Sequence, residues 1–365
     1  MYALIFLLWT GLFYDAPPLP EVLPPPESFA ADEREVILDF MNVTDETGIS
    51  NSRKLAERRS RYKVKKSFQA HPMHWPGITW DKEKKDGIYR VVQIVWDDAD
   101  LSGTLDLRAF SSLRFLFIFK HDVSGGGLSK YTAGGGTEPF RLHLPENSSL
   151  EVLVCDGAGL SSLELDGQKQ LRHLSCEKNP IRNFDLSQLS KLEFFSCWDC
   201  PAENVRFPSA KPKLQSLSLS GTCCPPETVY GMKKIKRFGW CTKSVLPADF
   251  PAYLASCTEL EFQDISSPAL DFFKNRSLVF LTLTSLPSLT VLDLRDSEKL
   301  EYLEITDCPK LRRIILPASL RPDLCSEDEA PLCTVLENIP TEEVEFSDGT
   351  VLSLKEFLGE EVELE

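Results

Sequence analysis

Apolar residues recur along most of the chain at a fixed period. In the segment that starts at Leu150, they occupy positions 1, 4, 6, 11, 14 and 16, and the segment that starts at Leu171 repeats this pattern 21 residues later. The spacing elsewhere is 21 or 22 residues, with one exception of 37 between Leu113 and Leu150. The first positions are Val91, Leu113, Leu150, Leu171, Leu192, Leu214, Ile235, Cys257, Leu278 and Leu300. Such a period indicates a solenoid of ten stacked units.

The spacing within a unit predicts how the units stack. Side chains alternate between the two sides of a strand, so positions 4 and 6 point inward while positions 3, 5 and 7 point outward. One strand per unit builds a long parallel sheet, and the apolar residues at positions 14 and 16 close the opposite wall. Because one unit cannot bury both sets alone, its neighbours supply the rest of the core.

The best-formed unit carries a recognisable signature. Leu171 to Ser187 matches the form L-x-x-L-x-C-x-x-N-x-L-x-x-L-D-L-S through Cys176, Asn179 and Asp185. Through this signature the chain resembles the leucine-rich-repeat superfamily over residues 91–320. The resemblance is strongest to bacterial secreted or surface (internalin-like) repeats. The resemblance implies an α/β-type, right-handed, mostly β solenoid with a parallel sheet on its concave face and an irregular convex side. It also implies a partner-binding role, although the Asn of position 9 survives only at Asn179.

The segments outside the repeats divide the chain further. Residues 1–15 are an apolar segment, too short to span a bilayer, and are interpreted as an export signal or as an apolar tail. Residues 16–30 are a Pro-rich linker, and residues 31–90 form an N-terminal cap with a helix from Ala31 to Asn42. The solenoid covers residues 91–320 with an insertion at 124–139, and residues 321–365 form an acidic C-terminal cap with a hairpin at Asp348-Gly349.

Two polar segments have more than one interpretation. The basic stretch from Arg53 to Lys66 could contact an acidic partner, but a solvated loop that offsets the acidic body is the favoured interpretation. A phosphate-binding loop needs a strand before it, a helix after it and a Lys in the turn, whereas the glycines of the Gly-rich insertion sit in a flexible run. It is either a flexible excursion or an adaptable loop over the concave face.

Charge excludes some partners. The net charge is −15 over 365 residues, and such an acidic surface repels phosphate backbones and anionic lipid. We therefore expect no nucleic-acid partner and no membrane insertion by the folded body. A monomer with a protein or peptide ligand is expected, located extracellularly or at the cell surface, with a cytoplasmic location as the alternative.

The candidate reactive residues favour structural roles. Cys197 and Cys200 form a C-x-x-C, but Cys197 falls at inward position 6, so packing is preferred over a metal or redox role. Cys325 and Cys333 lie outside the frame and could form a disulfide if the protein is exported. His71 and His74 have no Cys or carboxylate to complete a metal set. We expect no catalytic residue, metal or cofactor.

The outward positions nominate a binding surface on the concave face, because exposed aromatics on a rigid sheet are typical anchors. The candidate residues are Phe115, Phe117, Phe119, Val154, Asp156, His173, Glu177, Phe194, Trp198, Glu259, Glu261, Phe280, Tyr302 and Glu304. The alternative is that the insertion or the N-terminal cap covers the Phe run. The expected function is a non-enzymatic, exported, protein- or peptide-binding module. An intracellular scaffold is the second hypothesis, and an enzyme with its chemistry in the cap is a distant third.

Overall fold

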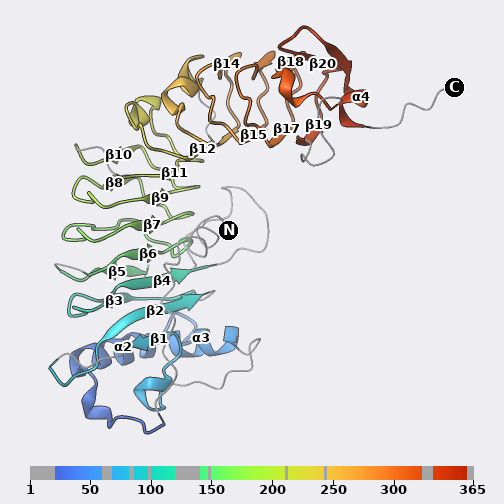
Figure 1. Ribbon diagram of the computed structural model, residues 1–365. Helices are drawn as coiled ribbons and strands as arrows, with labels where there is room; N and C mark the ends of the chain where they lie inside the picture. Colours follow the sequence, from blue (N-terminus) through green and yellow to red (C-terminus); the bar gives the residue numbers. More distant parts are fainter. Residues whose placement is uncertain are drawn as a thin grey trace. The chain divides into compact units, whose positions relative to one another are not determined.

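The protein was analysed as a computed structural model that describes residues 21–59, 68–81, 86–97, 100–120, 140–146, 149–209, 213–241, 245–322 and 332–359. The chain divides into unit 1, residues 1–213, and unit 2, residues 214–365. Both units are mostly β, and each contains a parallel sheet built from one strand per repeat (Figure 1). The predicted solenoid with a parallel sheet is therefore confirmed.

The long sheet follows the frame of the sequence. In unit 1 its strands are β1 (Ile78–Trp80), β2 (Val91–Asp97), β4 (Phe115–Phe119), β6 (Val152–Val154), β7 (His173–Ser175) and β9 (Phe194–Ser196). In unit 2 they are β11 (Ser216–Ser218), β12 (Arg237–Cys241), β13 (Glu259–Gln263), β15 (Phe280–Thr284), β17 (Tyr302–Thr306) and β19 (Cys333–Glu337). Apart from β1, which is antiparallel to β2, the strands pair in parallel, so equivalent positions line up in rows across each sheet.

The opposite wall is also built of strands. Unit 1 has β3 (Thr104–Asp106) paired with β5 (Arg141–His143), and β8 (Asn183–Asp185) paired with β10 (Asn204–Arg206). Unit 2 has β14 (Ala269–Asp271), β16 (Val291–Asp293), β18 (Arg313–Leu316), β20 (Glu343–Phe346) and β21 (Val351–Ser353) in one sheet. The convex side was expected to be irregular. The apolar residue at position 14 or 15 instead lies at the centre of a short strand in β3, β8, β10, β14 and β16, because stacking aligns the backbones for ladder hydrogen bonds.

One backbone feature recurs after the long-sheet strand. Position 8 of most described units has a positive φ, between 53° and 75°. Its residues are Gly157, Lys178, Asp199, Gly221, Asp264, Ser285, Asp307 and Asn338. Gly, Asn and Asp tolerate this left-handed conformation best, which accounts for most of these residues. The conformation turns the chain away from the sheet at the same point in each repeat.

The turn is supported by a polar group at position 9. The Asn179 side chain donates to the carbonyl oxygens of Cys155 (2.8 Å), Cys176 (3.0 Å) and Glu177 (3.1 Å), and it accepts from the Leu160 amide (3.0 Å). At the same position in the next unit, the Cys200 thiol donates to the Cys176 carbonyl at 2.9 Å. A smaller donor thus replaces part of the Asn network, which explains how the fold persists without an Asn ladder.

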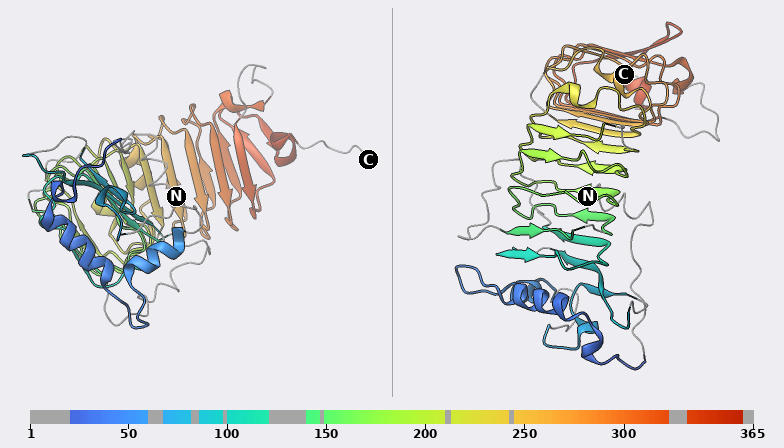
Figure 2. Two further views of the ribbon diagram at one scale, coloured as in Figure 1. Left: turned by 90° about the horizontal axis from the view of Figure 1, so that it is seen from below. Right: turned by 90° about the vertical axis from the view of Figure 1, so that its left-hand side faces the viewer.

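Two helices lie beside β1 and β2 at the start of unit 1 (Figures 1 and 2). The predicted helix is confirmed as α2 (Ala31–Asn42), which buries Ile37, Phe40 and Met41, and α3 (Asn51–Arg59) follows it. The Phe40 ring stacks on Trp96 with 5.7 Å between centroids. This covers the end of the core that the first repeat would otherwise expose.

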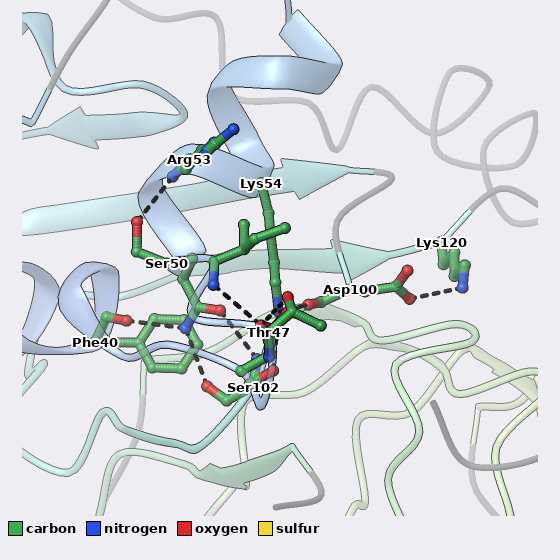
Figure 3. A network of polar contacts seen from close by, with 11 residues as sticks. Phe40, Thr47, Ser50, Arg53, Lys54, Asp100, Ser102 and Lys120 are labelled. Carbon is green, nitrogen blue, oxygen red and sulfur yellow. Dashed lines mark hydrogen bonds and ion pairs between the residues drawn. The ribbon is translucent and has the colours of Figure 1, made fainter. Parts of the chain in front are cut away.

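A polar network fastens α3 to the loop before β3 (Figure 3). The Asn51 amide donates to the carbonyls of Phe40 (2.9 Å) and Ser102 (3.0 Å), and its oxygen accepts from the Ser102 amide (3.0 Å). The Lys54 ammonium forms an ion pair with Asp45 (2.9 Å) and donates to the Ser102 hydroxyl (3.0 Å). Lys54 of the basic stretch is therefore a structural residue, whereas residues 60–66 of that stretch lie outside the described part of the chain.

Past residue 320, each sheet of unit 2 gains one more parallel strand. Tyr302 pairs with Cys333 and Ile314 pairs with Val344, offsets of 31 and 30 residues. The sequence frame ends before these strands because ten further residues interrupt the period. The predicted hairpin is confirmed: β20 and β21 are antiparallel, with Gly349 at φ 86° in the turn, and α4 (Leu354–Leu358) follows.

Candidate functional site

The first part of the predicted binding face is buried. Phe115 and Phe117 in β4, with Val152 and Val154 in β6, form an apolar cluster in which none is more than 4% exposed. Val95 and Phe119, at the margin of the cluster, are partly buried. The expectation that Phe115, Phe117 and Val154 are exposed was therefore wrong. The reason is visible in the strands themselves, since a continuous apolar run such as residues 115–119 is typical of a strand buried on both faces.

The next rungs of unit 1 are buried as well. The His173 and Phe194 rings stack with 4.0 Å between centroids and 5° between planes, and neither side chain is more than 4% exposed. Burial lowers the pKa of His173 to about 3, so the imidazole is neutral at physiological pH. These two predicted contact residues are part of the protein interior.

The carboxylates of the unit 1 face bind hydroxyl groups of the neighbouring repeat. Asp156 accepts from the Ser175 hydroxyl (2.7 Å) and the Glu177 amide (2.8 Å), while Glu177 accepts from the Ser196 hydroxyl (2.7 Å). Burial and the Glu177 charge raise the pKa of Asp156 to about 7, and burial raises the pKa of Glu177 too. Trp198, half-buried, has the Lys178 ammonium 5.0 Å from its ring centroid. The two carboxylates and the Trp198 ring are therefore already in contact with other groups of the protein.

The side of the long sheet that carries the outward positions, which we call the outer face, is more exposed in unit 2. In β13, β15 and β17 the inward residues are buried, and the outward residues are half-buried or exposed. Phe280 is 42% exposed, and its ring lies 6.2 Å from that of Tyr302. The structure thus brings Glu259, Glu261, Phe280, Tyr302 and Glu304 together on three adjacent strands, as the frame predicted.

The charges on this face are only partly balanced. The Arg237 guanidinium in β12 forms an ion pair with Glu259 at 2.8 Å. Glu304 accepts a hydrogen bond from the Tyr302 hydroxyl at 2.9 Å. The Glu261 carboxylate makes no hydrogen bond or ion pair within the described residues, and burial together with the Glu304 charge raises its pKa.

Two residues of the face were missed from the sequence. Arg237 and Gly239 lie in the seventh unit, where Trp240 makes the frame degenerate. A Cβ on Gly239 would lie 3.4 Å from the Ser220 hydroxyl oxygen and 3.7 Å from a Glu261 carboxylate oxygen. The sequence signal for this part of the face was a glycine at outward position 5, because it places no side chain beside Glu261 on that side.

The cysteines of the C-x-x-C and of the two preceding units are packed in the core. Cys155, Cys176, Cys197 and Cys200 are all 0% exposed, as the inward positions of the C-x-x-C predicted. Burial raises the pKa of both Cys176 and Cys200, which keeps these thiols protonated. Cys333 is exposed at the start of β19, and its disulfide with Cys325 stays a prediction. Cys325 itself lies outside the described residues.

The remaining candidate sites have structural contacts or cannot be placed. His71 caps a short 3-10 helix by accepting from the Met73 amide (3.2 Å), and its other nitrogen lies 2.7 Å from the Pro24 carbonyl. Within the described ranges no cluster of His, Cys, Asp and Glu could hold a metal ion, and no helix there is long and apolar enough to cross a membrane. The apolar segment 1–15 and the insertion 124–139 lie outside those ranges.

Comparisons with known proteins add little beyond the fold. No family model matches the chain, and no curated protein does. Among solved structures, a plant ice-binding protein is 13% identical with a TM-score of 0.47, and the alignment covers 86% of this chain and 98% of that one. The functional domain of InlJ from Listeria monocytogenes, described as including a cysteine ladder, is 16% identical with a TM-score of 0.35, covering 67% of this chain and 53% of that one. The pneumococcal vaccine antigen PcpA is 12% identical with a TM-score of 0.26, covering 74% and 86%. The solenoid is consistent with leucine-rich-repeat-like units, and at these scores the likenesses carry no argument about function.

Proposed function

We propose that this chain is a non-enzymatic, monomeric protein- or peptide-binding solenoid whose binding surface is the outer face of unit 2. One observation carries the proposal: the outward side chains of β13, β15 and β17 are accessible on a paired sheet whose inward side chains are buried. A parallel ladder fixes the spacing of these side chains, so little conformational entropy is lost when a partner binds. Phe280 and Tyr302 supply the aromatic contact area that binding surfaces favour.

A display library of random peptides, selected on the immobilised full chain, tests this proposal. Thr282→Trp places a large side chain at the centre of the face, whereas Val291→Trp places one on the 38% exposed Val291 of β16, in the other sheet. We expect the selected peptides to bind the wild type and Val291→Trp, and to lose binding to Thr282→Trp. Equal binding to both variants would move the binding surface elsewhere.

We also propose that the protein acts outside the cell. The apolar segment 1–15 has the length of the apolar region of an export signal, and a Pro-rich linker separates it from the folded body. The test is the N-terminal residue of protein recovered from the growth medium and from cell extract of the source organism. Protein in the medium that starts after the apolar segment supports export. Protein found only in cells, with that segment intact, favours the intracellular scaffold.

A further inference from the structure

The outward residues of β12, β13, β15 and β17 form three parallel rows, at positions 3, 5 and 7 of the repeat. The row at position 3 holds the large side chains Arg237, Glu259, Phe280 and Tyr302. The row at position 5, which we call the central row, holds Gly239, Glu261, Thr282 and Glu304. Short residues therefore alternate with two glutamates in the central row, next to an aromatic pair in the adjacent row.

The two glutamates of the central row share one environment. They lie two strands apart with only Thr282 between them, which separates their Cα atoms by about 10 Å. Glutamate side chains can reach toward each other over that span, and the raised pKa of Glu261 has the Glu304 charge as one of its causes. No cation of the described residues is paired with either carboxylate. The only Arg in these rows, Arg237, is already engaged by Glu259.

The neighbouring aromatic pair has a complementary property. Phe280 is the most exposed side chain in the rows of β13, β15 and β17, and its ring is tilted 38° to that of Tyr302. Aromatic faces attract cations electrostatically, and a guanidinium group both stacks on a ring and donates hydrogen bonds from its edges. The carboxylates and the rings therefore favour the same chemical group.

We propose that the central row binds an arginine side chain from an extended segment of another protein, with the guanidinium between Glu261 and Glu304 and against the rings of Phe280 and Tyr302. This inference rests on the proposed function and specifies its ligand. Charge complementarity supports it, because a cation would remove the unbalanced repulsion between the two carboxylates. Arginine is preferred over lysine because its planar fork can donate to two carboxylates at once.

The probe is a synthetic peptide with two arginines in a Leu- and Ser-containing sequence, labelled for fluorescence anisotropy with the full chain. A matched peptide replaces arginine by citrulline, which keeps the shape and removes the charge, and a third carries lysine. We expect the citrulline peptide to bind at least about tenfold more weakly than the arginine peptide, with lysine in between. Binding of the arginine peptide should weaken as salt rises, because the contacts are half-exposed.

The protein variant is Glu261→Gln with Glu304→Gln, which preserves side-chain shape. Its matched control is Glu298→Gln with Glu343→Gln, which removes two exposed charges of the same unit away from the central row. The first variant should bind the arginine peptide at least about tenfold more weakly, and the control should bind it like the wild type. Removing the repulsion should leave the melting temperature of the first variant unchanged or higher, which shows that lost binding is not lost folding.

Three outcomes overturn the inference: equal binding of the arginine and citrulline peptides, wild-type affinity in the double glutamine variant, or no binding of the arginine peptide. These are distinguishable from failure of the proposed function. If library peptides without arginine still lose binding to Thr282→Trp, the face is a binding surface and only its ligand is wrongly assigned. If no peptide distinguishes Thr282→Trp from Val291→Trp, both proposals fail.

Discussion

The outer faces of the long sheets in unit 1 and unit 2 carry side chains from the same positions of the repeat, but these side chains differ in burial. In unit 1, Phe115, Phe117, Val152 and Val154 are interior residues, and the polar groups beyond them bond to one another. In unit 2, the equivalent positions of β13 to β17 are accessible and include a carboxylate without a bonded partner among the described residues. A repeat frame therefore sets the side of the sheet on which a side chain lies, and burial is decided separately for each region.

The comparison also separates stability from recognition. Aromatic residues in the buried face contribute mainly to the free energy of unfolding, because their full apolar area is removed from water. Aromatic residues in the accessible face have little such role and remain available to a partner. Three pairs of variants test this contrast.

The largest expected difference is between two phenylalanines at outward positions. Phe117→Ala should lower the free energy of unfolding by about 3–5 kcal/mol, because it leaves a cavity where the side chain is 1% exposed. Phe280→Ala should lower it by less than about 1 kcal/mol, since that side chain is 42% exposed. Urea denaturation followed by circular dichroism measures both. Similar losses for the two variants would mean that the faces do not differ in burial.

A smaller contrast concerns carboxylates and pH. The pKa of Asp156 rises from about 3.8 to about 7 in the folded protein, so the folded state binds more protons than the unfolded state between these values. Its contribution to stability is therefore greatest below about pH 4 and declines as pH rises to about 7, by roughly 4 kcal/mol. Urea midpoints of wild type and Asp156→Asn between pH 5 and pH 8 check this prediction.

Asp156→Asn should flatten the decline with pH. Glu261→Gln in unit 2 should flatten it less, because the Glu261 side chain is only partly buried. If Asp156→Asn leaves the slope unchanged, the Asp156 carboxylate is not buried in solution.

The smallest effects are expected from ion pairs, and here the two units should agree. Arg172 with Glu193 (3.0 Å) in unit 1 and Arg237 with Glu259 (2.8 Å) in unit 2 are both partly exposed. Glu193→Gln and Glu259→Gln should each cost less than about 1 kcal/mol, and salt should reduce that cost. Denaturation at low and high salt measures it. A markedly larger cost in unit 1 would show that the contrast between the units extends beyond the outer faces.

Much of the candidate site was predictable. The frame placed Glu259, Glu261, Phe280, Tyr302 and Glu304 on one side of the long sheet because strand alternation and parallel stacking depend only on local sequence. It missed Gly239 and Arg237 because an aromatic residue, Trp240, replaces the aliphatic residue of that unit. It also ended before β19 because an insertion of ten residues interrupts the period there.

The period, the parallel sheet and the inward residues could be read from the sequence alone, because they follow from apolar spacing and the geometry of a strand. The exposure of the outward residues could be read only from the three-dimensional structure, because it depends on packing over a face and not on the residue's own position. Phe117 and Phe280 illustrate the point: both occupy outward positions, yet one is core and the other is surface. The sequence signal for that difference was the continuous apolar run of β4, which contrasts with the alternation of Leu and Thr over residues 281–284 of β15.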